Sequence, residues 1–86
     1  MLEEKGNHMK KKIYLNTISK VKDFVNISNR QEFNIFIKSG RYVIDAKSIM
    51  GIFSLDLSNQ LELYPEKCTQ EQFDEYCKQI EQFTEE

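Results

Sequence analysis

The sequence predicts a single α+β domain, an open-faced β-sandwich in which a four-stranded antiparallel sheet carries three helices on one face. Apolar residues alternate in four short segments, as in half-buried strands, and recur every three or four residues in three others, as in amphipathic helices. A Ser-Gly turn also joins two alternating segments into a hairpin. The predicted order is strand, helix, strand, strand, helix, strand, helix.

The first two elements are a strand over residues 11–16 and a helix over residues 18–28. The alternating residues of the strand are Ile13, Tyr14 and Leu15. The apolar stripe of the helix consists of Ile18, Val21, Phe24 and Val25. Thr17 is the predicted N-cap, because its hydroxyl can accept an N–H group that the first turn leaves unpaired.

A hairpin and a short helix follow. Strands are expected over 33–38 and 41–46, with Ser39 and Gly40 in the turn between them. The second helix is expected over 49–57. Gly51 lies inside this helix and lowers its propensity by about 1 kcal/mol relative to alanine, so tertiary contacts must hold it in place.

The last strand and helix complete the order. Residues 60–64 form the fourth strand, which Pro65 is expected to end, because proline cannot donate to a strand ladder. Thr69 and Gln72 then form a T-x-x-Q capping box at the start of the third helix. Its apolar stripe consists of Phe73, Tyr76, Cys77, Ile80 and Phe83.

The face of the sheet opposite the helices is expected to be open to water and to carry three aromatic side chains. These are Tyr14, Phe36 and Tyr64. Scattered surface aromatics are ordinary, but a cluster could support self-association or the binding of a partner.

The 86 residues are 40% hydrophobic and 30% charged, which predicts a packed domain. The formal net charge is −2, and Lys10-Lys11-Lys12, the one basic cluster, stands at a strand start, so no nucleic-acid partner is expected. No apolar run reaches the roughly 18 residues of a membrane span, and the N-terminus lacks the apolar run of a signal peptide. A cytoplasmic protein without a membrane partner is therefore expected.

Residues 1–9 look like a leader added for expression that ends in a His-Met cloning scar, with the domain covering residues 10–86. His8 is the only histidine of the chain, and on this interpretation it belongs to the leader. Acid–base shuttling, phosphohistidine chemistry and histidine metal sites are then not expected.

The remaining residue types favour a protein that is not an enzyme. Cys68 and Cys77 stand nine positions apart without a CxxC pair, so reduced thiols rather than a metal site are expected, with Cys77 buried on the helix stripe. The sequence has no paired acid and base in a recognisable motif and no phosphate-binding glycine loop. No cofactor is expected.

The segment 47–55, which reads K-S-I-M-G-I-F-S-L, carries the clearest functional signal. Ser48 stands at the predicted helix start, where it can act as N-cap and where a phosphoryl group of about −1.5 to −2 charge would be tolerated. Three large apolar residues beside it could form a docking surface, or could simply be core residues of a short helix. They are Ile49, Met50 and Phe53, whereas Ile52 and Leu55 are the better core candidates.

This K-S-I-M-G block, together with the element order, resembles the regulatory-serine segment of HPr, the histidine-containing phosphocarrier protein of the bacterial sugar phosphotransferase system, as it occurs in Gram-positive bacteria. The resemblance spans residues 10–86 and includes Phe24-Val25 at the expected distance before the hairpin. It implies an HPr-like open-faced β-sandwich.

The resemblance also implies site residues and partners. Ser48 corresponds to the serine that a dedicated ATP-dependent kinase phosphorylates, and Lys47 lies at the edge of the docking patch, though a solvated lysine explains it equally well. The implied patch residues are Ile49, Met50 and Phe53. The implied protein partners are an HPr kinase-like enzyme, phosphotransferase-system components or a transcription regulator.

The phosphocarrier loop of the family, G-x-H-x-R-P, is not matched. The corresponding stretch reads Asn16-Thr17-Ile18-Ser19-Lys20 and contains no histidine, arginine, proline or glycine. Thr17, Ile18 and Ser19 therefore mark a degenerate active-site loop, since an alkyl phosphate on a hydroxyl transfers far less readily than a phosphoramidate.

Three functional hypotheses follow. The leading one is a non-catalytic regulatory module of the kind known in carbon catabolite repression, which binds partners through Ser48 and the helix that follows it. The second is a degenerate or accessory phosphocarrier. The third is a structural module that forms a homodimer through the open face of the sheet.

Overall fold

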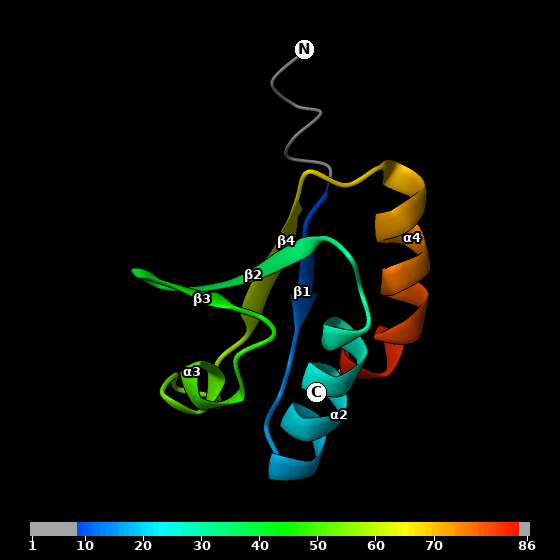
Figure 1. Cartoon of the computed structure of the whole chain (residues 1–86). Coiled ribbons are helices and arrows are strands. Elements are labelled where there is room, and N and C mark those ends of the chain that lie inside the picture. Colours follow the sequence, from blue (N-terminus) through cyan, green and yellow to red (C-terminus); the bar gives the residue numbers. More distant parts are fainter. Residues whose placement is uncertain (1–8, 85–86) are drawn as a thin grey trace.

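The computed structural model describes residues 9–84 and has the predicted α+β fold (Figure 1). The elements in chain order are β1 (Lys11–Ile13), α2 (Ile18–Asn29), β2 (Asn34–Ser39), β3 (Tyr42–Asp45), α3 (Ile49–Phe53), β4 (Leu61–Glu66), α4 (Gln70–Gln79) and a 3₁₀ helix, η1 (Glu81–Phe83). The proposed leader, with His8, lies outside the described residues except for Met9, which packs against the core.

The four strands form one antiparallel sheet in the order β1-β4-β2-β3. All three α-helices lie on the same face of it. For α3 this follows from the register, because Ile44 pairs with the buried Ile37 and touches Gly51 of the helix. On the open face, the rings of Phe36 and Tyr64 lie opposite each other with centroids 6.4 Å apart, as the alternation predicted.

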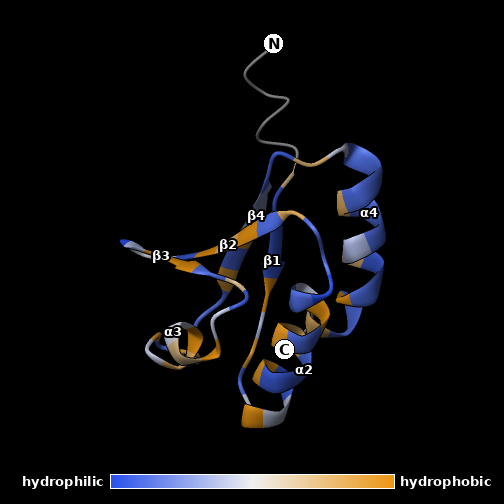
Figure 2. Cartoon of the chain, in the orientation of Figure 1, coloured by the Kyte–Doolittle hydropathy of each residue, from blue (hydrophilic) through white to orange (hydrophobic). Residues whose placement is uncertain are grey.

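The core lies between the sheet and the helices, where the apolar sides of the strands meet those of α2 and α4 (Figure 2). Phe24 of α2 is fully buried, and its ring packs edge-to-face on that of Phe83 with centroids 5.9 Å apart. Phe83 also accepts a backbone hydrogen bond from Tyr14, 2.7 Å long, which ties the end of the chain to the strand region at the start.

A buried hydrogen bond joins α2 to α4. The hydroxyls of Ser28 and Tyr76 lie 2.7 Å apart, and both residues are fully buried. Burial raises the pKa of Tyr76 well above its usual value, and the hydrogen bond with Ser28 offsets only part of that rise. The pair is therefore neutral over the physiological pH range, and each hydroxyl satisfies the other.

We expect Tyr76→Phe to lower the free energy of unfolding by about 1 to 2 kcal/mol, because it leaves the buried hydroxyl of Ser28 without a partner. Urea denaturation followed by circular dichroism measures this difference. Tyr42→Phe is the matched control, since the side chain of Tyr42 is 66% exposed. Equal effects of the two substitutions would contradict the assigned role of the buried pair.

Two predicted strand boundaries were wrong by two residues or more, and the others differ by at most one residue. The first strand was expected to reach residue 16 but ends at Ile13, because β4 begins opposite it at Leu61 and the next N–H group, that of Tyr14, bonds to Phe83 instead. The fourth strand was expected to end before Pro65 but continues to Glu66.

The proline is tolerated because of where its nitrogen points. Pro65 pairs with Ile35 of β2, but the carbonyl of Ile35 accepts the N–H of Ala46 on the other side, 2.8 Å away. The nitrogen of Pro65 therefore points away from β2, toward the side of β1, where it has no partner strand because β1 begins only at Lys11, opposite Leu63. No ladder hydrogen bond is lost there.

Two predicted helix ends also differ. The second helix was expected to reach residue 57 but ends at Phe53, because Ser54 bonds back to the carbonyl of Gly51 through both its N–H and its hydroxyl. The third helix was expected to carry its stripe to Phe83 as one element, but α4 ends at Gln79 and continues as η1. The capping box of Thr69 and Gln72 is confirmed.

Candidate functional site

Ser48 caps α3 from an extended backbone conformation. Its Oγ atom accepts a hydrogen bond from the N–H of Gly51, 3.1 Å long, and the side chain is half-buried. The predicted capping role is therefore confirmed. The hydroxyl makes this contact as an acceptor and remains within reach of solvent at the rim of the helix.

Gly51 allows α3 to lie unusually close to β3. A Cβ atom at this position would stand 2.7 Å from Cγ2 of Ile44 and 3.0 Å from Oγ of Ser48. Carbon atoms do not approach each other so closely without displacement, so only glycine fits here with the present packing. Gly51 lowers the helix propensity of α3, but its missing side chain allows α3 and its N-cap to pack close to β3.

The three proposed docking residues are exposed to different degrees. Met50 is 75% exposed and Phe53 39% exposed, so both are available at the surface. Ile49 is half-buried and packs against the core, which makes the core interpretation the better one for this residue. Ile52 and Leu55 are buried, as expected.

Ile18 adds a third exposed apolar side chain to this region. It was assigned to the buried stripe of the first helix but is 64% exposed, because it stands at the first position of α2, beyond the sheet. α2 and α3 contact each other, and α3 and the start of α2 both lie in the lower part of the molecule (Figure 1). We call Ile18, Met50 and Phe53, which are proposed below as a binding surface, the docking face.

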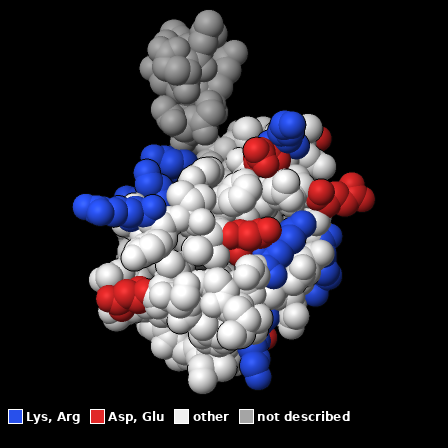
Figure 3. Space-filling view, turned by 60° about the vertical axis from the view of Figure 1, so that its left-hand side comes forward, with Lys and Arg blue, Asp and Glu red and all other residues white. Residues whose placement is uncertain are grey.

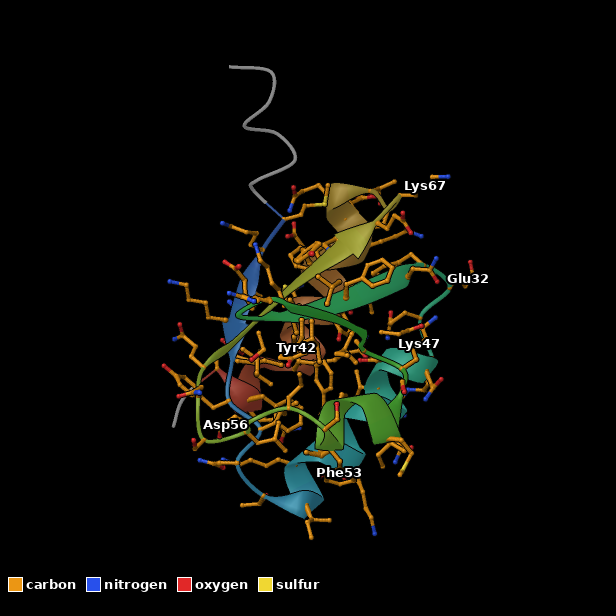
Figure 4. The ribbon with its side chains drawn as sticks, turned by 90° about the vertical axis from the view of Figure 1, so that its left-hand side faces the viewer. Glu32, Tyr42, Lys47, Phe53, Asp56 and Lys67 are labelled. Carbon is orange, nitrogen blue, oxygen red and sulfur yellow. The ribbon has the colours of Figure 1, made fainter. Side chains whose placement is uncertain are left out.

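Charge is sparse around the docking face. A space-filling view toward this side shows few Lys, Arg, Asp or Glu side chains over its lower half, whereas both signs gather above (Figure 3). With the same side toward the viewer, Phe53 lies on the lower side of α3 and Tyr42 above the helix (Figure 4). An exposed apolar surface with a polar rim is typical of a protein-binding site.

Lys47 has a structural role that its position in the sequence did not indicate. Its ammonium Nζ donates to the backbone carbonyl of Gln31, 2.9 Å away, just after the end of α2. Its backbone N–H donates to Oδ1 of Asp45 over 2.8 Å. The side chain therefore ties the approach to α3 to the end of α2, and it is half-buried rather than solvated.

The loop predicted to be a degenerate active site, residues 17–19, is held by its own hydrogen bonds. Thr17 caps α2 by accepting the N–H of Lys20 over 3.1 Å, as predicted. The ammonium of Lys20 reaches back to Oδ1 of Asn16, also 3.1 Å away. The nucleophilic groups that residues 17–19 offer are the hydroxyls of Thr17 and Ser19, which form alkyl phosphates and not phosphoramidates.

Asp56 closes the segment that follows α3. Its carboxylate accepts the side-chain hydroxyl and the backbone N–H of Ser58 and the side-chain amide of Asn59. The hydrogen bonds from Ser58 are the main reason why the pKa of this exposed carboxyl is lowered. These hydrogen bonds form a turn, so the carboxylate of Asp56 is engaged in local structure.

The two cysteines are free and half-buried, so Cys77 is less buried than predicted. Burial raises the pKa of both thiols, which lowers their thiolate fraction at neutral pH and hence their reactivity. Within residues 9–84 no group of three His, Cys, Asp or Glu side chains stands close enough to hold a metal ion. No helix in this part of the chain is long and apolar enough to cross a bilayer.

The sheet order, the helices on one face and the capped short helix define the HPr fold, the fold of phosphocarrier-type proteins. The chain is similar to HPr-C-His from Thermoanaerobacter tengcongensis, with 27% identity and a TM-score of 0.69 over 90% of this chain and 97% of that one. It resembles the phosphocarrier protein HPr of Bacillus anthracis with 22% identity and a TM-score of 0.62, over 88% and 95% of the two chains.

A third similar structure is Crh, the catabolite repression containing protein of Bacillus subtilis, at 21% identity and a TM-score of 0.61 over 86% of this chain and 88% of that one. Crh was solved as an intertwined dimer with a swapped domain. No family model matches the chain, and no curated protein matches it by sequence. The structural comparisons therefore confirm the resemblance to the HPr family at the level of the fold.

Proposed function

We propose that this protein is a non-catalytic regulatory module of the HPr type, which binds protein partners through the docking face and is switched by phosphorylation of Ser48. The observation that carries the proposal is the position of Ser48. Its hydroxyl lies at the rim of α3, two residues before the 75% exposed Met50. The module acts in the cytoplasm in this proposal, with phosphotransferase-system components or a transcription regulator as partners.

Two features of the site support a switch rather than a carrier. The only histidine of the chain, His8, stands ten residues before Ile18 and not at the start of α2, where the family carries its phosphoryl group. The hydroxyls of residues 17–19 cannot replace an imidazole in rapid transfer, whereas a phosphoserine is suited to a lasting signal.

The effect of the modification follows from its charge. A phosphoryl group on Ser48 would add about −1.5 to −2 charge beside Met50 and Phe53, a surface with few charged side chains. A partner that binds the bare apolar face would lose affinity through the desolvation of this charge, and a partner with an arginine placed opposite it would gain affinity. Phosphorylation of Ser48 would therefore determine which partner the docking face binds.

The test is incubation of the purified protein with ATP and an HPr kinase from a Gram-positive bacterium, followed by intact mass. We expect the gain of one phosphate, and its complete loss in Ser48→Ala. Ser54→Ala is the matched control, because Ser54 stands at the other end of the same helix and is exposed. This control variant should gain phosphate as the natural sequence does.

The reaction includes a known HPr in the same tube. If that HPr is modified and this protein is not, the kinase does not recognise the docking face and the switch is excluded. If Ser54→Ala also loses the phosphate, the loss in Ser48→Ala does not identify Ser48 as the modified residue and the proposal fails.

A further inference from the structure

The two edges of the sheet are protected to different degrees. The β1 edge carries three consecutive lysines over residues 10–12, one of which forms an ion pair with Glu62, 3.4 Å long. Next to this edge, the N–H of Tyr14, one residue after β1, is bonded to the carbonyl of Phe83 in η1. Lysines and covering segments are the usual protection of an edge strand against pairing with another chain.

Within the described residues 9–84, the β3 edge has neither form of protection. Its residues 42–45 read Tyr-Val-Ile-Asp, and the side chains of Tyr42 and Val43 are 66% and 54% exposed. In Figure 1 the β2–β3 hairpin projects from the body of the molecule, away from α2 and α4, so these helices do not block its approach to another chain.

The register shows which backbone groups point outward from β3. Ala46 donates to Ile35 of β2, and since consecutive residues of a strand face opposite sides, Ile44 and Tyr42 also face β2. Val43 and Asp45 therefore face outward. The carbonyl of Asp45 accepts the N–H of Ser48 over 3.0 Å, which leaves both backbone groups of Val43 and the N–H of Asp45 toward solvent.

We propose that β3 pairs with β3 of a second copy of this chain, antiparallel about a two-fold axis at Val43, to give a dimer with a continuous eight-stranded sheet. In this register the two Val43 residues exchange a pair of hydrogen bonds, since an antiparallel strand pairs with itself about any outward-facing residue. Isologous pairing of this kind closes at two copies.

The charges that flank β3 support a second copy as the occupant. Arg41 and Asp45 stand two residues before and two residues after Val43, so each lies opposite the other of the second chain. Opposite charges across a strand pair stabilise it, and the two apolar Val43 side chains meet at the centre. The segment 41–45 is thus complementary to itself, both in its backbone and in its charges.

The experiment is sedimentation velocity of the full chain from about 10 μM to about 1 mM, a range that covers weak association. The mass should rise with concentration from 10.2 kDa toward twice that value. Val43→Lys places two like charges directly opposite each other, so its dissociation constant should rise roughly tenfold or more. Met50→Lys, an equal change on the exposed side of α3, is the control and should leave the constant unchanged.

Amide hydrogen exchange gives a second readout that needs no variant. The N–H groups of Val43 and Asp45 should exchange more slowly as the concentration rises, while those of Tyr42 and Ile44, already bonded to β2, should not change. A chain that stays monomeric to about 1 mM overturns the proposal. A dimer that survives Val43→Lys, or that Met50→Lys weakens equally, uses another surface or a strand exchange and also overturns it.

Discussion

Phe24→Ala is expected to lower the free energy of unfolding by about 3 to 5 kcal/mol, because it removes a fully buried ring and leaves a cavity between α2 and η1. The ring of Phe83 loses its edge-to-face partner, and through Phe83 the hydrogen bond that holds Tyr14 is weakened as well. A small domain has a total stability of about 5 to 15 kcal/mol, so one substitution removes a large part of it. Urea denaturation measures the loss.

The matched control is Phe53→Ala, the same substitution on the docking face. Phe53 is 39% exposed, so its removal leaves no closed cavity and should cost about 1 kcal/mol or less. If both variants lose the same stability, Phe53 is a core residue and not part of a docking surface. The comparison therefore tests the division between core and docking face as well as the packing of α2.

Local chemistry explains which features could be predicted from the sequence. The caps Thr17, Ser48 and Thr69 were correctly predicted, because a hydroxyl that accepts an N–H three residues later needs no distant partner. The order of strands and helices was also predicted, since it rests on hydrophobic periodicity within each segment. The fold class follows from that order.

The features that were missed depend on residues far apart in the chain. Pro65 fits inside β4 because β1 does not extend beside it, and the ammonium of Lys47 finds the carbonyl of Gln31, sixteen residues away. Ile18 repeats at the helical interval, yet it is 64% exposed whereas Val21, three residues later, is fully buried. Periodicity predicts which side of a helix is apolar, but it does not predict how far the neighbouring elements extend along that helix.

The docking face shows the same division. An exposed position for Met50 and Phe53 was expected from their spacing beside Ser48, while the exposure of Ile18 was not, and a docking role for all three stays a prediction. That Ile49 packs inward depends on the close seating of α3 on β3, which no local pattern specifies. Gly51 is the residue that permits this seating.

Gly51→Ala is expected to destabilise the domain although alanine is the better helix former. The propensity gain is at most about 1 kcal/mol, and a helix of five residues realises only part of it. The added Cβ atom opposes this gain, because it would stand 2.7 Å from Cγ2 of Ile44. An overlap of this kind costs about 1 to 3 kcal/mol in a packed interior. The overlap outweighs the propensity, so the urea midpoint should fall.

A double-mutant cycle with Ile44→Ala separates the two effects. Ile44→Ala removes the atom that the new Cβ would meet, so the double variant should be more stable than the sum of the single losses predicts. Additive losses, or a Gly51→Ala variant more stable than the natural sequence, would show that α3 shifts freely on β3. Because the same Cβ would lie 3.0 Å from Oγ of Ser48, Gly51→Ala should also slow the proposed phosphorylation of Ser48.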